Sequence, residues 1–343
     1  MFRVPGPASP GPQVEEGDGG MTRWTEGTVP SQAGRTVVIT GGNTGLGFEA
    51  ARMLAQAGAT VVLACRDPAR AAAAAARIQA AGAATAGPAG SRVRVDVVRL
   101  DLASLASVRE AADQLRASYP AIDLLINNAG GVNPRYQLTE DGFERTLATN
   151  HLGPFALTGL VLDRLLPVPG SRVVTVASIG HRRGVIDFDD LQADRGYRFQ
   201  QAYFQSKLAN LLFTCELQRR LAAAGADTIA VAAHPGNART EFGRDMSGVV
   251  RIAMSPRLRV LTWWLMQSPQ VGALATVRAA TDPQARGGDY FGPPGRAQFT
   301  GYPVRVESSA ASRDPEVARR LWDESQRLTG VSYPIATVRP SRG

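Results

Sequence analysis

Residues that build disulfides and metal sites are scarce in this chain. Two cysteines, Cys65 and Cys215, occur in 343 residues, which is too few for a disulfide framework. Such cysteine usage favours a reducing compartment, and we expect a cytoplasmic location. The three histidines, His151, His181 and His234, are far apart and have no cysteine or histidine partner at metal-ligand spacing. We therefore predict no metal site.

Long apolar runs are absent as well. No stretch of about 20 residues is free of charge, and the N-terminus has no apolar run of the signal-peptide type. The most apolar segment, VLTWWLM at 260–266, is too short to span a bilayer. Residues 1–30 are rich in glycine and proline and lack periodicity, so we predict a disordered N-terminal tail there and a C-terminal tail at 336–343.

Lysine is nearly absent, although the chain is basic. Of 38 basic residues only Lys207 is a lysine, and the formal net charge is +8. A basic chain raises the question of nucleic acid or an anionic membrane as a partner. The arginines are scattered, however, and we interpret them as the result of a coding bias toward arginine, to which a preference for anionic cofactors can add. We therefore predict no nucleic-acid partner. The presence of a single lysine, Lys207, among so many arginines needs a separate explanation.

From Arg35 on, short β-branched runs alternate with helical patterns. One of these patterns, the alanine-rich stretch at 71–76, is interpreted as an exposed helix. Parallel strands separated by helices form a sheet that is covered on both faces. The sequence therefore predicts one α/β domain over 31–335, with a Rossmann-type doubly wound parallel sheet. Six strands are expected, at 36–40, 60–65, 92–100, 122–127, 172–178 and 228–234.

After His234 the pattern loosens. A helix is expected at 268–281 and a short strand within GGDYFG at 287–292. A last helix should begin at Pro315, with Asp314 as its N-cap and Gly330 as its stop. These elements predict a C-terminal extension of the sheet domain.

The segment TGGNTGLG at 40–47 lies between the first expected strand and helix. Gly41, Gly45 and Gly47 allow a sharp turn and a close approach to a pyrophosphate, and the helix N-terminus supplies amide donors. A tight turn without any ligand is the alternative interpretation of this cluster alone.

The TGxxxGxG spacing resembles that of the short-chain dehydrogenase/reductase family, and five further motifs follow in the family's order. They are NNAG at 127–130, Asn150 in TNHLG, Ser178 at the end of a strand, the pair Tyr203-x-x-x-Lys207, and HPGNART at 234–240. The chain also resembles the retinol-dehydrogenase-like branch over about residues 22–335, in LACRDPAR, HRRGVIDFDDLQ, YFQSKLANLLFTCELQRRL and LWDESQRLTG. The longer Ser178–Tyr203 spacing is a feature of that branch.

Four residues are expected to carry the chemistry. Hydride transfer from a nicotinamide to a carbonyl leaves an alkoxide that needs a proton, which a tyrosine can give if its pKa falls from about 10 toward 7. Tyr203 and Lys207 are four residues apart and share a helix face, so the ammonium can stabilise the phenolate. Ser178 would hydrogen-bond the substrate oxygen. The resemblance implies that Lys207 also holds the nicotinamide ribose and that Asn150 positions a relay water, although Asn150 and Ser178 alone are ordinary turn and strand-end residues.

The residues that follow the second strand indicate the choice between NAD and NADP. An acidic residue there would bind the ribose 2′-hydroxyl of NAD, whereas this chain has Arg66, which can form a charged fork with a phosphate. We predict NADP over NAD, although Thr44 stands where some NADP-specific members have a basic residue. By the resemblance, Asp101 contacts the adenine and Thr240 the carboxamide. The full expected cofactor set is Gly41, Asn43, Thr44, Gly45, Leu46, Gly47, Arg66, Asp101, Asn128, Ala129, Gly130, Tyr203, Lys207, Pro235, Gly236 and Thr240.

Residues 237–265 lie where the family places its substrate lid. Their apolar side chains either line a pocket or pack the lid on the domain; those in question are Leu261, Trp263, Trp264 and the adjoining Met266. The neighbouring arginines also permit contact with a membrane surface, which we rank lower. The Tyr203 helix has apolar residues on more than one face, which permits a homodimer through paired helices; they are Leu208, Leu211, Leu212, Phe213 and Leu217.

The sequence thus predicts an NADP(H)-dependent oxidoreductase that interconverts a carbonyl and an alcohol on a mostly apolar small molecule, with Tyr203 as the acid/base. A catalytically idle NADP(H)-binding regulatory or scaffold protein of the same fold is the alternative. The intact set of four catalytic side chains argues against it. Light-dependent protochlorophyllide reductases are a second rival, but Ala209 and Asn237 stand where their cysteines are expected.

Overall fold

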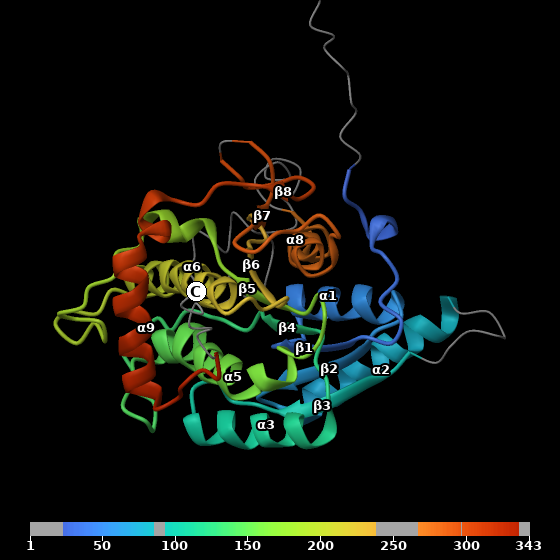
Figure 1. Ribbon diagram of the computed structural model, residues 1–343, viewed down its shortest axis with the longest axis horizontal. Coiled ribbons are helices and arrows are strands. Elements are labelled where there is room, and N and C mark those ends of the chain that lie inside the picture. Colours follow the sequence, from blue (N-terminus) through green and yellow to red (C-terminus); the bar gives the residue numbers. More distant parts are fainter. Residues whose placement is uncertain (1–22, 86–92, 238–266, 296, 336–343) are drawn as a thin grey trace, which may run out of the picture.

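Eight strands form one sheet in the computed structural model of the protein, which describes residues 23–85, 93–237, 267–295 and 297–335 (Figure 1). The strand order is β3-β2-β1-β4-β5-β6-β7-β8, and every neighbouring pair is parallel except the last. The order reverses between β1 and β4, the switch point at which doubly wound sheets bind ligands. The strands are β1 (Thr36–Thr40), β2 (Thr60–Cys65), β3 (Val95–Arg99), β4 (Leu124–Asn127), β5 (Arg172–Val176), β6 (Ile229–Ala233), β7 (Tyr290–Gly292) and β8 (Val304–Arg305).

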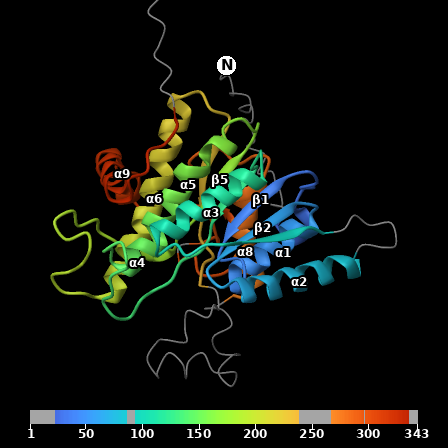
Figure 2. The same cartoon turned by 90° about the horizontal axis from the view of Figure 1, so that it is seen from below.

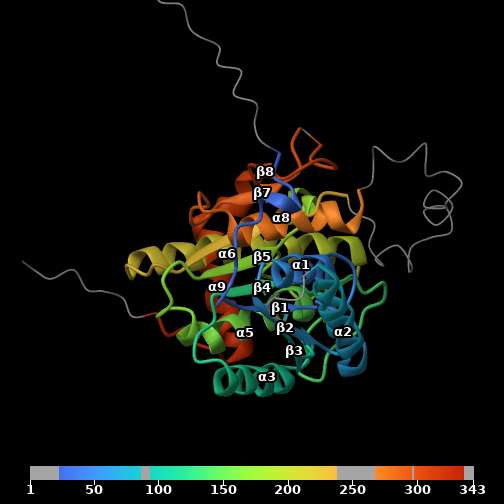
Figure 3. The ribbon, with the colours of Figure 1, turned by 90° about the vertical axis from the view of Figure 1, so that its right-hand side faces the viewer.

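Helices cover both faces of this sheet (Figure 3). In β1, Val37 and Ile39 belong to the core under α1, α2 and α8, whereas Val38 belongs to the core under α3, α5 and α6. The strands are buried on both sides, which explains their continuous apolar runs and confirms the predicted Rossmann-type fold with its six strands. The helices are α1 (Gly45–Gln56), α2 (Pro68–Thr85), α3 (Leu105–Ser118), α4 (Arg145–Leu147), α5 (Gly153–Val161), α6 (Phe199–Ala223), α8 (Pro269–Thr281) and α9 (Pro315–Thr329).

The predicted start and end of the last helix are confirmed. The Asp314 carboxylate accepts hydrogen bonds from the backbone nitrogens of Glu316 and Val317 at 2.9 and 3.1 Å, Pro315 opens α9, and Gly330 ends it with φ 64°. The alanine-rich helix differs from expectation on one face only, since Ala72, Ala73 and Ala76 are exposed as predicted. Ala71, Ala74 and Ala75 are buried against the sheet, because small side chains let α2 approach it closely.

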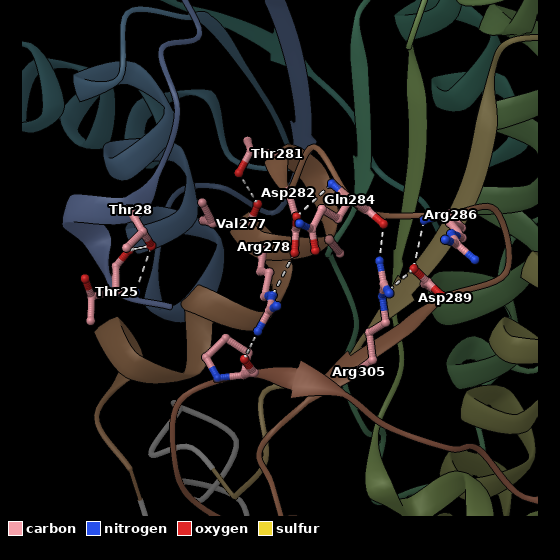
Figure 4. Close-up of polar contacts among 12 residues, drawn as sticks. Thr25, Thr28, Val277, Arg278, Thr281, Asp282, Gln284, Arg286, Asp289 and Arg305 are labelled. Atoms are coloured by element: carbon pink, nitrogen blue, oxygen red, sulfur yellow. Dashed lines mark hydrogen bonds and ion pairs between the residues drawn. The ribbon is translucent and has the colours of Figure 1, made fainter. Parts of the chain in front are cut away.

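The chain has regular structure earlier than predicted. Residues 23–30 fall in the predicted tail, yet Glu26–Thr28 form the turn η1, where the Thr28 hydroxyl donates to the Thr25 carbonyl at 2.7 Å (Figure 4). Glu26 pairs with Arg52 of α1 at 2.6 Å. This ion pair ties the segment to the domain, so the tail boundary at residue 30 is placed too late. The rest of the predicted tail lies outside the described residues.

The sheet ends in a strand that the sequence did not reveal. β8 is two residues long and pairs antiparallel with β7. Arg305 forms an ion pair with Asp289 at 2.9 Å and donates to the Gln284 carbonyl (Figure 4). The Val306 backbone nitrogen donates to the Tyr290 carbonyl at 2.8 Å. These contacts fix the start of the segment that leads to α9.

Helix α9 crosses α6 on the outside of the domain (Figures 1 and 2). Leu208 and Leu212 of α6 pack with Leu321 of α9, and Phe213 stacks on Trp322 at 5.9 Å between ring centroids. Leu208, Leu212 and Phe213, which are among the apolar residues that suggested a pair of α6 helices, are therefore buried under the chain's own extension. Leu211 packs instead with Ala177, Ala232 and Tyr290.

Two observations concern membranes and metal ions as partners. Of the helices in the described ranges, none has both the length and the apolar character needed to cross a membrane. The same ranges contain no group of three or more His, Cys, Asp or Glu side chains arranged to hold a metal ion. The predicted lid at 237–265 lies outside the described residues apart from Asn237, as do the expected C-terminal tail and Thr240.

Candidate active site

The glycine loop after β1 packs on the NNAG segment after β4. Gly41 has φ +67°, and a Cβ on Gly47 would lie 2.4 Å from both the Asn128 Nδ2 and the Gly41 carbonyl oxygen. Asn128 fixes the two segments together, because its Nδ2 donates to the Thr40 carbonyl at 2.9 Å and its backbone nitrogen donates to the Thr40 hydroxyl at 3.0 Å. Only glycine fits at position 47, and the loop forms a backbone cradle at the switch point.

The rest of this loop lies at the surface. Thr44 is exposed and precedes α1. Gly45, at the first position of the helix, has φ +57°, and a Cβ added to it would meet no atom within 4 Å. Asn43 and Leu46 are half-buried. The α1 N-terminus therefore faces open space, as a phosphate site requires.

Cys65 ends β2 beneath the loop. Burial raises the pKa of its thiol to about 11, although hydrogen bonds from the backbone of Gly42 and Asn43 lower it in part. The thiol stays neutral, and it puts no negative charge where a cofactor phosphate would bind.

Arg66 and Asp101 follow two neighbouring strands. Arg66 is exposed after β2 and, as far as the chain is described, has no carboxylate partner. The adjacent Asp67 is engaged instead at the start of α2, where its side chain accepts from the Arg70 backbone nitrogen at 3.1 Å. Asp101 is half-buried, and its Oδ1 accepts from the Ala103 nitrogen at 3.0 Å. The predicted fork of Arg66 is thus available to an anion.

Lys207 is 4% exposed, on the inner side of α6. Its Nζ donates to the Val176 carbonyl at 3.0 Å, at the end of β5. A Cβ on Gly130 would lie 3.1 Å from both the Lys207 Nζ and the Asn150 Oδ1, which places the NNAG segment, Asn150 and Lys207 side by side. Burial lowers the pKa of Lys207 to about 8. No carboxylate within the described residues pairs with it.

Asn150 lies in a π-helical turn, Ala148–Leu152, a conformation that often marks functional positions. Its side chain is completely buried. The Oδ1 accepts from the Gly131 nitrogen at 2.8 Å, and the Nδ2 donates to the Gly131 carbonyl and the Ser206 hydroxyl, each at 2.9 Å. Asn150 therefore links the NNAG segment to α6 and is no ordinary cap.

Ser178 and Tyr203 complete the set. Ser178 caps the 3₁₀ turn η4 (Ile179–Arg183), and its Oγ accepts from the Gly180 nitrogen at 3.1 Å. Burial raises the pKa of Tyr203, while a hydrogen bond from Ser178 lowers it to a smaller extent. The Lys207 Nζ is 5.8 Å from the centroid of the Tyr203 ring. The net direction of this pKa is upward, opposite to the fall toward 7 that the expected chemistry needs.

The Pro235–Gly236 turn lies beyond β6. Gly236 has φ +64°, and a Cβ there would lie 2.3 Å from the Phe299 carbonyl oxygen. The Pro235 carbonyl accepts from the Gln267 side chain. The turn is thus held by residues that come before and after α8, and its third expected member, Thr240, is outside the described residues.

One neighbour of the site was missed by the sequence reasoning. His181 contacts the Ser178 carbonyl through its ring, and the three-residue spacing from Ser178 was the available signal.

Comparisons with known proteins agree with this geometry. The sequence model of the family described as short chain dehydrogenase matches residues 35–248. Human retinol dehydrogenase 13 is 40% identical over 322 residues, covering 92% of each chain. The crystal structure of an uncharacterized protein from Mycobacterium paratuberculosis has a TM-score of 0.73 at 41% identity, covering 91% of this chain and 100% of that one.

A more distant structure shows a bound cofactor. A blue fluorescent protein from a metagenomic library, in complex with NADPH, has a TM-score of 0.55 at 26% identity and covers 75% of this chain and 95% of its own. The order of the motifs, the buried lysine beside Asn150 and the extent of these matches lead to one assignment. The chain belongs to the short-chain dehydrogenase/reductase family, in its retinol-dehydrogenase-like branch, and is an NAD(P)-dependent oxidoreductase of alcohol and carbonyl groups.

Proposed function

We propose that this protein is an NADP(H)-dependent oxidoreductase that interconverts a carbonyl and an alcohol on a mostly apolar small molecule, with Tyr203 as the acid/base. The observation that carries the proposal is the buried ammonium of Lys207. A buried charge without a carboxylate partner costs several kcal/mol of stability. This cost is explained if the ammonium stabilises the Tyr203 phenolate and binds the nicotinamide ribose.

The four side chains have separate tasks in this proposal. Tyr203, whose pKa burial raises, is the proposed acid, which gives a proton to the alkoxide that develops when a carbonyl is reduced. Ser178 hydrogen-bonds the substrate oxygen beside it. Lys207 is largely cationic at pH 7, since its pKa is about 8, and lowers the energy of the phenolate that remains. Asn150 positions a water for the return of the proton.

The residues of the glycine loop and the start of α1 are compatible with a bound dinucleotide. A Cβ would fill the cradle at Gly47, and the loop amides and the α1 N-terminus would bind the pyrophosphate. Asp101 would contact the adenine. The bound nicotinamide would supply or accept the hydride.

NADP is the cofactor we propose over NAD. Arg66 supports it, since this guanidinium is exposed and has no carboxylate partner in the described part of the chain, and it could bind a 2′-phosphate through two charged hydrogen bonds. The NADPH complex of a protein with the same fold supports it as well. An apolar alcohol or aldehyde as substrate is supported by the relatives named retinol dehydrogenase.

Location and assembly are proposals of a more general kind. A reducing cytoplasm suits the two cysteines, which are both free. A homodimer would use a face other than the part of α6 that α9 covers.

The test is loss of NADPH absorbance with a panel of apolar aldehydes and ketones. We expect turnover by the wild-type protein and none above background by Tyr203→Phe, which keeps the ring and removes the hydroxyl. NADPH binding, followed by its fluorescence, should be similar in the two proteins. Tight NADPH binding without turnover of any carbonyl would favour the idle regulatory protein instead.

A further inference from the structure

His181 is fully buried beside the Ser178 turn and has no role in the reaction described above. Its Nδ1 lies 2.7 Å from the Ser178 carbonyl oxygen, and its Nε2 lies 3.1 Å from the Ser309 backbone nitrogen. A carbonyl only accepts hydrogen bonds and a backbone N–H only donates them. The imidazole is therefore neutral, with its proton on Nδ1.

The surroundings keep the ring in this state. Burial lowers the pKa of His181, and the nearby Arg182 lowers it further, against the opposing effect of the Ser178 carbonyl. The Tyr290 ring packs edge-on against the imidazole, with 5.7 Å between the centroids and 85° between the planes. The ring can neither turn freely nor gain a proton without losing the Ser309 contact.

The two contacts of His181 join parts of the fold that are distant in sequence. Ser309 belongs to the segment that follows β8, which the Val306–Tyr290 hydrogen bond holds to the sheet. Ser178 is the N-cap of η4 and carries the hydroxyl that hydrogen-bonds Tyr203. The imidazole thus ties this turn to the C-terminal extension.

The opposite side of η4 presses on α6. A Cβ on Gly180 would lie 2.8 Å from the Phe204 Cδ1, and one on Gly184 would lie 2.4 Å from the Phe204 carbonyl oxygen. Phe204 is the neighbour of Tyr203 in the chain. The turn η4 is therefore packed between the C-terminal extension and α6, the helix that carries Tyr203. The Ser178 Oγ accepts a hydrogen bond from the Gly180 nitrogen, so its position depends on the position of the turn.

We propose that His181 is a positioning residue, which holds the Ser178 hydroxyl against Tyr203 by locking η4 onto the segment 306–309. The inference rests on the proposed catalytic function of Ser178. Without the imidazole, the Ser178 carbonyl keeps the bond from the His181 backbone nitrogen at 3.1 Å, but the turn loses its tie to Ser309. A displacement of about 1 Å in a catalytic group can cost on the order of a hundred-fold in rate.

Two substitutions separate the contacts. In His181→Asn the amide nitrogen can replace Nδ1 and donate to Ser178, whereas in His181→Gln the amide group reaches the Nε2 position and can accept from Ser309. Since the proposal assigns the positioning to the Ser309 tie, we expect His181→Asn to lower kcat about tenfold or more at saturating NADPH and aldehyde. His181→Gln should stay close to the wild-type kcat. The Kd of NADPH should not change in either variant, and both should lose similar amounts of thermal stability.

Equal kcat values for the two variants, or losses that follow their melting temperatures, would reduce His181 to a packing residue. If the wild-type protein reduces no carbonyl at all, the proposed function fails and kcat cannot be compared. In that case nitrogen-15 NMR of the imidazoles tests whether His181 has the tautomer that its two contacts require. We expect the Nδ1–H tautomer for His181 and the Nε2–H tautomer for His234, whose Nδ1 accepts from the Gly236 nitrogen at 3.2 Å. A charged or Nε2-protonated His181 at neutral pH would overturn the inference.

Discussion

Most of the groups that would hold the cofactor belong to one half of the sheet, and those that would carry the chemistry belong to another half that is built differently. The cofactor half, β1 to β4 with α1 to α3, offers mostly backbone: a glycine turn, a helix N-terminus and loops that lie at the surface. The catalytic half, β5 to β8 with α5, α6 and α9, offers side chains, of which Lys207 and His181 are buried and held by distant contacts with Val176 and Ser309.

This difference decides how each half responds to substitution. A backbone cradle tolerates changes in side chains as long as no Cβ enters it. A buried side-chain site depends on the shape of each group as well as its charge, because its neighbours cannot move away. We therefore expect conservative changes to be severe in the catalytic half and graded in the cofactor half.

The largest effect is expected for Lys207→Arg. A guanidinium is planar and wider than an ammonium, with donors in a fixed fork, and the site has little room, since even a Cβ added to Gly130 would lie 3.1 Å from the Lys207 Nζ and the Asn150 Oδ1. The variant should fold, lose at least about a hundred-fold in kcat at saturating NADPH, and have a higher pH optimum for alcohol oxidation, since the phenolate is less stabilised.

The exposed pair of Arg116 and Asp163, 2.9 Å apart, provides the matched control, because Arg116→Lys should change nothing measurable. Near-normal turnover of Lys207→Arg would mean that the lone lysine has no special role, and the catalytic assignment would be weakened.

In the cofactor half, Arg66→Ala should weaken NADPH binding by roughly ten- to a hundred-fold, since a charged hydrogen bond contributes about 1.5–3 kcal/mol. NADH binding should change little. Arg70→Ala is the control, because this arginine is also exposed at the start of α2. Titration of both cofactors checks the expectation, and equal losses for NADPH and NADH would remove the support for NADP.

The cradle itself is tested by Gly47→Ala and Gly45→Ala. The first puts a methyl group 2.4 Å from Asn128 and Gly41, which we expect to cost about 1–3 kcal/mol of unfolding free energy and to weaken NADPH binding. The second meets no atom within 4 Å and costs only the strain of φ +57°, about 1 kcal/mol. Urea unfolding and NADPH titration measure both. A larger loss in Gly45→Ala would show that conformation, not space, limits the loop.

The same contrast explains what the sequence could predict. The glycine loop, the Tyr203–Lys207 spacing and the Asp314–Pro315 start of α9 depend on neighbours within a few residues, and all were found. The His181–Ser309 contact spans 128 residues, and β8 has only two residues, so neither leaves a local pattern. The burial of one face of the alanine-rich helix and the raised pKa of Tyr203 depend on what packs around them, which periodicity does not contain.

The smallest effect is expected for Asp314→Ala, which tests whether α9 belongs to the catalytic half or only covers it. Loss of an N-cap costs about 1 kcal/mol of unfolding free energy. Helix α9 approaches the site through Ser325, whose hydroxyl lies 2.9 Å from the His151 Nε2, and His151 is the neighbour of Asn150. Because the cap lies several turns before Ser325, fraying at Asp314 should leave that contact and Asn150 in place. We expect a lower melting temperature with unchanged kcat and unchanged Kd for NADPH. A kcat that falls with the cap, and falls again in Ser325→Ala, would show that the extension transmits its position to Asn150.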